Sequence, residues 1–329
     1  MAFPAQRLRR LRRTPTLRRM VRESRLSVDD IVYPLFIVHG RGVHEEIPAL
    51  PGNYHLSLDR LVDEVQQARE LGIPAVLLFG VPERRDREAS ESYAPDGIVQ
   101  QAVRTVRETA PDMAVMTDVC LCEYTEHGHC GIIKDGYLDN DESLQLLARV
   151  AVSHAQAGSD LLAPAAMLDG QIATMRRALD DQGFGNTGII SYAAKFASVL
   201  YDPFFKEGTH SMLTFGDKRT HQMDPGNGDE ALREIALDIE EGADIIMIKP
   251  AMTYLDVLWR ARSRFAVPLA VYNVSGEYAM IAGAAQGGRV DQSRAMHEVM
   301  TSFKRAGANL IVTYFAKQLA ADIREGRFD

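Results

Sequence analysis

The stretch EGADIIMIKP, residues 241–250, holds the pattern that decides the fold: a glycine, followed by a short run of apolar residues. The same order recurs at residues 71–79, 157–164 and 306–314. A glycine just past the last helical turn is a common end of a helix, and an unbroken apolar run is typical of a parallel strand with both faces buried. The repeat therefore predicts helices that alternate with the strands of a parallel sheet.

Eight such apolar runs follow one another along the chain, with helical patterns between them. The runs are Tyr33–Val38, Ala75–Phe79, Ala114–Val119, Asp160–Ala163, Gly188–Tyr192, Asp244–Ile248, Leu269–Asn273 and Leu310–Tyr314. The helical patterns include Leu58–Leu71, Gly97–Thr109, Glu142–Ala157, Asp229–Glu241 and Arg289–Ala306. This count predicts an α/β fold of the (β/α)8 TIM-barrel type over residues 31–329, behind an N-terminal arm of residues 1–30. The alternative, an open doubly wound sheet, lacks a Gly-x-Gly-x-x-Gly sequence after its first strand.

Charge is distributed unevenly along the chain. The 329 residues are 46% hydrophobic and 25% charged, which is typical of a globular protein and excludes the disordered and fibrous classes. The net charge is −8, yet residues 1–25 hold nine arginines and one acidic residue, a charge of +8, so the rest carries −16. A basic arm before an acidic body fits nucleic acid, membrane lipid, a targeting peptide or an acidic neighbouring subunit.

The sequence offers little support for export or membrane insertion. No apolar stretch of signal-peptide length follows the arginines, and no run approaches the ~18 apolar residues of a membrane span. The three cysteines lie close together, without partners elsewhere for a disulfide framework. We therefore expect a cytoplasmic protein that does not bind membranes, although a mitochondrial transit peptide stays an open alternative.

The first chemical motif is DVCLCEYTEHGHCG, residues 118–131, directly after the third predicted strand. Cys120, Cys122 and Cys130 can fold three thiolates onto one soft cation, and three protein ligands leave a fourth position open for water or substrate. Zinc fits such ligands better than magnesium does. The alternative is three buried, unpaired cysteines. We expect Asp118 and His129 beside the ligands without binding the ion, and we assign no role to His127.

The second motif is a pair of lysines. Lys249 ends the sixth predicted strand, and Lys195 lies just after the fifth. Neighbouring barrel strands would bring the two ammonium groups into one apolar mouth, where repulsion and desolvation lower the pKa of each amine. A neutral lysine can attack a ketone and form a Schiff base. The alternative is that each ammonium group simply reaches solvent at the rim of the barrel.

A third group of polar residues is scattered along the second half of the chain. Lys218 and Gln222 lie in GDKRTHQ, Ser275 lies in YNVSGEY, and Tyr314 closes the eighth strand. A cation, an amide and hydroxyls suit small carboxylate substrates, although each residue alone also fits an ordinary loop. The stretch Asp224–Gly228 lacks the Gly-Lys-Ser/Thr ending of a phosphate loop and predicts a turn or part of a lid.

At these residues the chain resembles the porphobilinogen synthase (5-aminolevulinate dehydratase) family. The resemblance runs from residues 7–23 through 242–254 to 311–316. Its most specific parts are DVCLC…HGHCG at residues 118–131 and GADIIMIKPAMTY at residues 242–254.

The resemblance implies a homo-octamer of barrels that joins two molecules of 5-aminolevulinate into porphobilinogen, with loss of two waters, in tetrapyrrole (haem) synthesis. By position, Lys195 and Lys249 match the two Schiff-base lysines of the family. The three cysteines match its catalytic Zn²⁺ ligands, which implies the zinc-using branch. Lys218 and Gln222 match positions near one substrate carboxylate, and Ser275 and Tyr314 match hydroxyls near the other.

Two departures from the family pattern and one further match concern the site. Phe205 stands where the family usually has a carboxylate-binding arginine, and Lys206 at the next position offers a charge but not a bidentate fork. Ala165 replaces a serine hydroxyl. Glu234 matches a ligand of an allosteric Mg²⁺ in some bacterial members, and it equally fits an ordinary exposed helical glutamate.

Two other functions are compatible with parts of the sequence. A Schiff-base class I aldolase would share a lysine but would need no three-cysteine loop. A non-enzymatic metal-binding or nucleic-acid-binding protein would explain the cysteines and the arm but not the paired lysines. Before an acidic barrel resembling an octamer-former, the arm is expected to wrap a neighbouring subunit rather than to bind nucleic acid.

Overall fold

The computed structural model of this protein describes residues 3–327, apart from the side chains of residues 202–205, and confirms the predicted barrel. Eight parallel strands form it: β1 (Ile31–Val38), β4 (Ala75–Val81), β5 (Ala114–Val119), β8 (Leu161–Pro164), β9 (Gly188–Lys195), β10 (Ile245–Lys249), β11 (Leu269–Asn273) and β12 (Leu310–Thr313). They pair in chain order, and β12 pairs with β1 to close the sheet, with Ile31 opposite Ile311. Each strand lies within a few residues of its predicted bounds.

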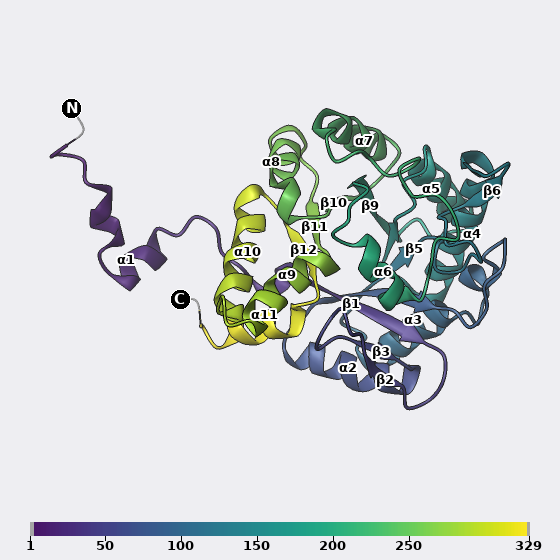
Figure 1. Cartoon of the computed structure of the whole chain (residues 1–329), viewed down its shortest axis with the longest axis horizontal. Helices are drawn as coiled ribbons and strands as arrows, with labels where there is room; N and C mark the ends of the chain where they lie inside the picture. Colours follow the sequence, from purple (N-terminus) through teal and green to yellow (C-terminus); the bar gives the residue numbers. More distant parts are fainter. Residues whose placement is uncertain (1–2, 328–329) are drawn as a thin grey trace.

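Helices surround the barrel on the outside (Figure 1). They are α2 (Leu58–Glu70), α3 (Ile98–Thr109), α4 (Asn140–Ala157), α5 (Gln171–Asp181), α7 (Gly228–Glu240), α8 (Leu255–Arg264), α9 (Ser275–Gln286), α10 (Gln292–Ala306) and α11 (Ala316–Arg324). Their apolar residues recur at helical spacing, as in α3, where Ile98, Ala102 and Val106 are buried. The five helices that the sequence predicted are all present.

The predicted glycine ends are found where helices return to the barrel. Gly242 and Gly307 have φ angles of +106° and +114°, in the left-handed region that favours glycine at a helix end. At Gly307 a Cβ atom would also lie 2.5 Å from Cγ of Arg262, so space as well as dihedral angle requires glycine there. After each of these two turns the chain enters the next barrel strand, β10 or β12.

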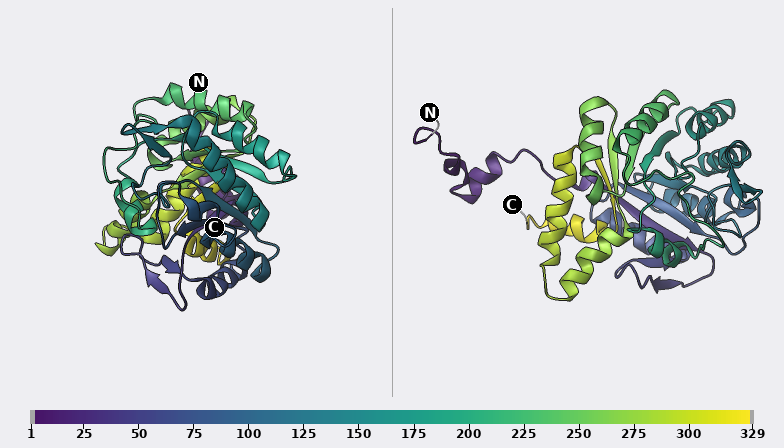
Figure 2. Two further views of the ribbon diagram at one scale, coloured as in Figure 1. Left: turned by 90° about the vertical axis from the view of Figure 1, so that its right-hand side faces the viewer. Right: turned by 45° about the horizontal axis from the view of Figure 1, so that its top comes forward.

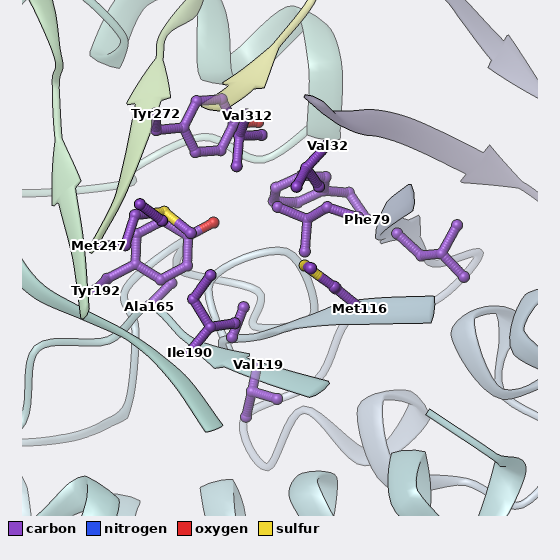
Figure 3. Packing of buried hydrophobic residues seen from close by; sticks show 14 of the residues in the cluster. Val32, Phe79, Met116, Val119, Ala165, Ile190, Tyr192, Met247, Tyr272 and Val312 are labelled. Atoms are coloured by element: carbon purple, nitrogen blue, oxygen red, sulfur yellow. The ribbon is translucent and has the colours of Figure 1, made fainter. Parts of the chain in front are cut away.

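The barrel interior is filled by side chains from different strands. Figure 3 shows Val32, Met116, Ile190, Tyr272 and Val312 meeting between the strands, and all of them are buried. Such layers make a TIM barrel a packed core rather than a pore. Open space is therefore found at the C-terminal ends of the strands, where the reactive residues gather.

Strand β9 is longer than predicted. The sequence placed the end of the fifth barrel strand at Tyr192, but β9 continues to Lys195. The added residues Ala193 and Ala194 are buried, and Ala194 pairs with Ile248 of β10, past an irregularity between Ile246 and Ile248. Lys195 therefore ends the strand itself, instead of lying on the loop that follows it.

Two hairpins and the short helix α6 (Asp202–Thr209) lie at the C-terminal mouth of the barrel. The hairpins are β2 (His44–Glu46) with β3 (Tyr54–Leu56), and β6 (Ile132–Lys134) with β7 (Tyr137–Asp139). The segment after α6 leads to the Asp224–Gly228 stretch, a turn in which Asn227 N donates to Asp224 O, as predicted. None of the helices in the described range is long and apolar enough to cross a membrane.

The N-terminal arm projects away from the barrel, as Figures 1 and 2 show. It contains a 3-10 turn, η1 (Leu8–Arg12), and the short helix α1 (Pro15–Met20), and neither contains a buried residue. Thr14 caps α1 by accepting a hydrogen bond from Leu17 N at 3.2 Å. The arm is thus locally ordered by its own turns and not by packing on the barrel.

The start of α9 predicts a contrast between two glycines of one helix. Gly276 N donates to Leu200 O at 2.6 Å, and a Cβ there would lie 2.2 Å from that oxygen, whereas a Cβ at Gly283 meets nothing within 4 Å. Gly276→Ala should lower the free energy of unfolding by about 1–3 kcal/mol through overpacking. Gly283→Ala should raise it by up to about 1 kcal/mol through helix propensity. Urea unfolding of both variants checks this, and equal effects would contradict it.

Candidate active site

Two lysines end neighbouring strands side by side. Lys249 is the last residue of β10 and pairs in register with Lys195, the last residue of β9. Both side chains are buried, with 8% and 5% of their surface exposed. The Lys195 Nζ donates a hydrogen bond to the Ala165 carbonyl oxygen at 2.6 Å. The structure thus excludes the alternative in which each lysine reaches solvent at the rim.

The environment of Lys249 favours its neutral form. Burial, and then the positive charge of Lys195, lowers the pKa of Lys249 to about 7. Its Nζ lies 4.3 Å from the ring centre of Tyr272 and 4.9 Å from that of Tyr201. These rings and its burial shield the amine from water, and desolvation and the charge of Lys195 outweigh the opposing effect of Asp118 on its pKa. A substantial fraction of Lys249 is therefore an uncharged nucleophile near neutral pH.

Two cavities meet at Lys249. One is lined by thiols and charged groups, and we call it the thiol cavity; its walls include Cys120, Cys122, Asp118, Glu123, Lys195, Lys218 and Gln222. The other is lined by apolar groups and hydroxyls, and we call it the hydroxyl cavity; its walls include Phe36, Leu50, Tyr272, Val274, Ser275 and Tyr314. Lys249, Tyr201 and Phe79 line both. Lys249 therefore faces both cavities at once.

The three cysteines form one compact cluster. Their Sγ atoms all lie within 4.8 Å of one another, all three residues are buried, and the Cys120 and Cys122 sulfurs are 3.1 Å apart. Hydrogen bonds from these two thiols hold the pKa of the Cys130 thiol well below its usual range. Three convergent sulfur donors on the wall of a cavity fit a soft divalent cation. The cluster can therefore bind a metal ion at the edge of the thiol cavity.

Two buried carboxyl groups lie beside the cluster. Burial, and then the negative charge of Glu123, raises the pKa of Asp118 to about 8. Burial also raises the pKa of Glu123, whose Oε2 accepts a hydrogen bond from Cys122 Sγ at 3.3 Å. The sequence placed Asp118 beside the metal ligands, but it did not select Glu123, although that residue directly follows Cys122.

The loop between α6 and α7 closes the thiol cavity with Lys218 and Gln222. Gln222 is buried, and its Oε1 lies 2.8 Å from the Tyr201 hydroxyl. Within the described residues its Nε2 has no acceptor, so a buried donor is left for a ligand. His129 does not join the thiol cluster, because its Nε2 lies 3.0 Å from the Phe215 carbonyl oxygen on the same loop.

Of the residues predicted to bind substrate or magnesium, three lie outside the two cavities or outside the described structure. The Phe205 side chain is outside the described residues. Lys206, in α6, is exposed and lines neither cavity. Glu234, in α7, lines a separate groove together with Asp169, and burial raises its pKa. Magnesium binding at Glu234 stays a prediction.

Sequence reasoning missed several residues that shape the site. Tyr201 lies outside every strand and helix pattern, yet it lines both cavities. Leu50 reaches the hydroxyl cavity from the loop between β2 and β3, held by a hydrogen bond from the Tyr278 hydroxyl to Pro51 O. No local signal marks either residue. Glu277 has none either, because the helix cap three residues before it is Val274, whose side chain cannot accept a hydrogen bond, so the Ser/Thr-x-x-Glu signature of a capping box is absent.

Comparisons with known proteins agree with this geometry. A family model described as delta-aminolevulinic acid dehydratase matches residues 5–322. The chain belongs to the delta-aminolevulinic acid dehydratase family. Proteins of this name from Synechocystis sp. and Bacillus subtilis are 51% and 48% identical to it, over 97% and 99% of this chain and 98% and 100% of theirs.

A solved member of the delta-aminolevulinic acid dehydratase family has the same fold. The Toxoplasma gondii enzyme, solved in complex with the reaction product porphobilinogen, superposes with a TM-score of 0.94 at 38% identity. The match covers 98% of this chain and 94% of that one. The chain is therefore an enzyme of the dehydratase type, a hydro-lyase, and the resemblance seen in the sequence is confirmed.

The lowered pKa of Lys249 predicts how its reactivity depends on pH. Trapping of a small ketone on Lys249 by borohydride should rise with pH through about 7 and then level off, because the neutral amine attacks. An exposed lysine, with a pKa of about 10.4, should keep gaining reactivity at higher pH. Mass spectrometry of the Lys249 peptide measures the midpoint. Lys195→Met should move it upward by removing a repelling charge, and a wild-type midpoint near 10 would contradict the prediction.

Proposed function

We propose that this protein is a porphobilinogen synthase that holds two molecules of 5-aminolevulinate in its two cavities and joins them through Schiff bases on Lys195 and Lys249. The observation that carries this proposal is the pair of lysines at the junction of the cavities, one of them with a pKa lowered to about 7. The family and the product complex of its Toxoplasma gondii relative support it.

The lysines supply covalent chemistry. Each Nζ attacks the ketone carbon of one substrate, the ketone oxygen leaves as water, and the resulting iminium withdraws electrons from the neighbouring carbon. The two substrates then form one carbon–carbon bond and one carbon–nitrogen bond, and both lysines return to free amines as the product leaves. Overall, two waters are lost. Holding both partners on adjacent strands converts a bimolecular step into an effectively unimolecular one.

The two cavities offer different partners for the substrate carboxylates. Ser275 and Tyr314 present hydroxyls in the hydroxyl cavity. The hydroxyl oxygens of Tyr314 and Tyr272 are 3.1 Å apart. Lys218 and Gln222, whose Nε2 has no acceptor among the described residues, present donors in the thiol cavity. Charge-assisted bonds of this kind bind and orient carboxylates. Phe205 cannot supply the charge of the usual arginine, so Lys218 carries that role in this chain.

Cys120, Cys122 and Cys130 would hold Zn²⁺ on the wall of the thiol cavity. Bound there, zinc supplies a Lewis acid for a substrate oxygen or amine and lowers the pKa of a bound water. The ion requires deprotonated thiols; the low pKa of Cys130 favours that state, whereas burial raises the pKa of Cys122 and the pKa of Cys120 is raised as well, so metal binding must displace the protons of these two thiols. The three cysteines are free thiols, which fits a reducing compartment, and we propose the cytoplasm.

The proposal predicts metal-dependent synthesis of porphobilinogen. Purified protein should convert 5-aminolevulinate to porphobilinogen, lose activity to a chelator and regain it with Zn²⁺. Lys249→Ala should abolish both turnover and borohydride trapping at this position, because its Nζ is the nucleophile, while zinc content stays at the wild-type level. Colorimetric product assay and elemental analysis measure these quantities. Chelator-resistant turnover would instead favour an aldolase-like enzyme without a catalytic metal.

The arm of residues 1–30 supports assembly in this proposal. Its side chains Phe3, Leu8 and Met20 are 71%, 80% and 72% exposed. Its arginines give it a positive charge, whereas the rest of the chain is acidic. A second copy of the barrel offers the complementary charge and would cover these apolar groups. We propose that the arm wraps a neighbouring subunit in a homo-octamer.

Removal of the arm tests this assembly. Deletion of residues 1–25 should yield smaller oligomers with lower activity, because the +8 charge and the apolar side chains of the arm are lost. Light scattering coupled to size-exclusion chromatography measures the mass. High salt should weaken the wild-type assembly in the same direction. An intact, fully active octamer without the arm would refute the role.

A further inference from the structure

Glu277 is a buried carboxylate that the mechanism above does not use. It lies in the first turn of α9, is 0% exposed and lines neither cavity. Its Oε1 accepts a hydrogen bond from Met252 N at 2.6 Å, and its Oε2 accepts from Val274 N at 3.0 Å and Asn273 Nδ2 at 3.2 Å. A buried carboxylate is costly unless it is hydrogen-bonded, so these contacts determine its place.

The partners of Glu277 lie at the ends of three neighbouring strands. Met252 follows Lys249, the last residue of β10, by three residues, and Asn273 is the last residue of β11. Thr313, the last residue of β12, donates from its hydroxyl to Asn273 Oδ1 at 3.0 Å. The network of Glu277, Asn273 and Thr313 therefore joins β10, β11 and β12 at the mouth of the barrel.

Each of these three strands also carries a polar group of the hydroxyl cavity. Lys249 ends β10, Ser275 follows β11 by two residues, and Tyr314 directly follows β12. The network accepts from the backbone N–H of Met252, three residues after Lys249, and of Val274, next to Ser275, and its member Thr313 directly precedes Tyr314. It is thus placed to set the distance between the nucleophilic amine and the two hydroxyls.

We propose that Glu277, with Asn273 and Thr313, is a positioning network that holds Lys249 in line with Ser275 and Tyr314. The proposal rests on the function given above, because the ketone of a substrate must meet Nζ while its carboxylate meets the hydroxyls. A misplacement of about 1 Å can cost about 100-fold in rate when reacting groups must be aligned.

The chemistry of the carboxylate explains why a glutamate is needed. Its two oxygens accept from opposite sides, one from the segment after β10 and one from the end of β11. In Glu277→Gln one oxygen becomes an NH₂ group, which faces an N–H donor instead of accepting from it. One side of the network is then lost while the size and shape of the side chain are kept.

The test compares Glu277→Gln with wild type in the full-length, zinc-loaded protein. We expect kcat/KM for porphobilinogen formation to fall about 100-fold, with a raised KM and a lowered kcat, because both carboxylate binding and amine attack are disturbed. Borohydride trapping of 5-aminolevulinate should slow at Lys249 but not at Lys195, and zinc content should not change, since β9 and the cysteine cluster lie outside the network.

A second buried glutamate provides a matched control. Glu64, in α2, is 2% exposed and accepts from the Tyr33 hydroxyl at 2.6 Å, on the outer side of β1 and away from both cavities. Glu64→Gln should lower Tm while kcat and KM stay at wild-type values. Thr313→Val should reproduce the Lys249 trapping defect in weaker form, and Thr313→Ser, which keeps the hydroxyl, should restore trapping.

The outcomes separate this network from mere stability and from the proposed function. Wild-type kcat and KM in folded Glu277→Gln would overturn the proposal, as would equal slowing of trapping at Lys249 and Lys195. The proposal would also be overturned if the loss of trapping in both the Glu277 and the Glu64 variant were simply proportional to the loss of Tm. If wild type makes no porphobilinogen, the proposed function fails. The network can then still be tested by ketone trapping, which should be slower at Lys249 in Glu277→Gln than in wild type and unchanged at Lys195.

Discussion

The register of β9 and β10 is the constraint on which the site depends. Because Lys195 and Lys249 end these strands opposite each other, two amines must share one buried space, and their repulsion adds to the cost of desolvation. The structure relieves that cost by giving Lys195 a carbonyl acceptor and by leaving Lys249 partly neutral. A shift of the β9–β10 register by one residue would turn one lysine out of the barrel, since successive side chains on a strand point to opposite faces.

Much of the fold was predictable because its signals are local. Glycines such as Gly242 end helices, and runs such as Leu269–Asn273 are too apolar for anything but a strand covered on both faces. The cysteine cluster was predictable for the same reason, since its three ligands lie within one loop. The end of β9 was predicted too early because Ala193 and Ala194 give a weak strand signal, and pairing with β10 extends the strand.

The parts of the site that were not predictable depend on contacts between distant segments. Leu50 enters the hydroxyl cavity only because Tyr278 holds Pro51 from across the barrel mouth. The cysteine loop is likewise fixed from outside: Ser211 donates to Cys122 O at 2.5 Å, and Arg85 bonds both Glu123 O and Thr209 O. No periodicity or spacing encodes such pairs. They arise when the loops of different strands meet at one end of the barrel.

The contrast between the two cavities has a consequence for symmetry. A condensation of two identical molecules begins with equivalent reactants, yet the product needs each of them to end in a different chemical role. One cavity surrounds its occupant with thiols, carboxyls and lysine amines, and the other with aromatic rings and hydroxyls. The walls alone can therefore make two copies of one compound unequal, in acidity and in orientation, before any bond between them forms. The asymmetry of the reaction therefore comes from the protein and not from its substrate.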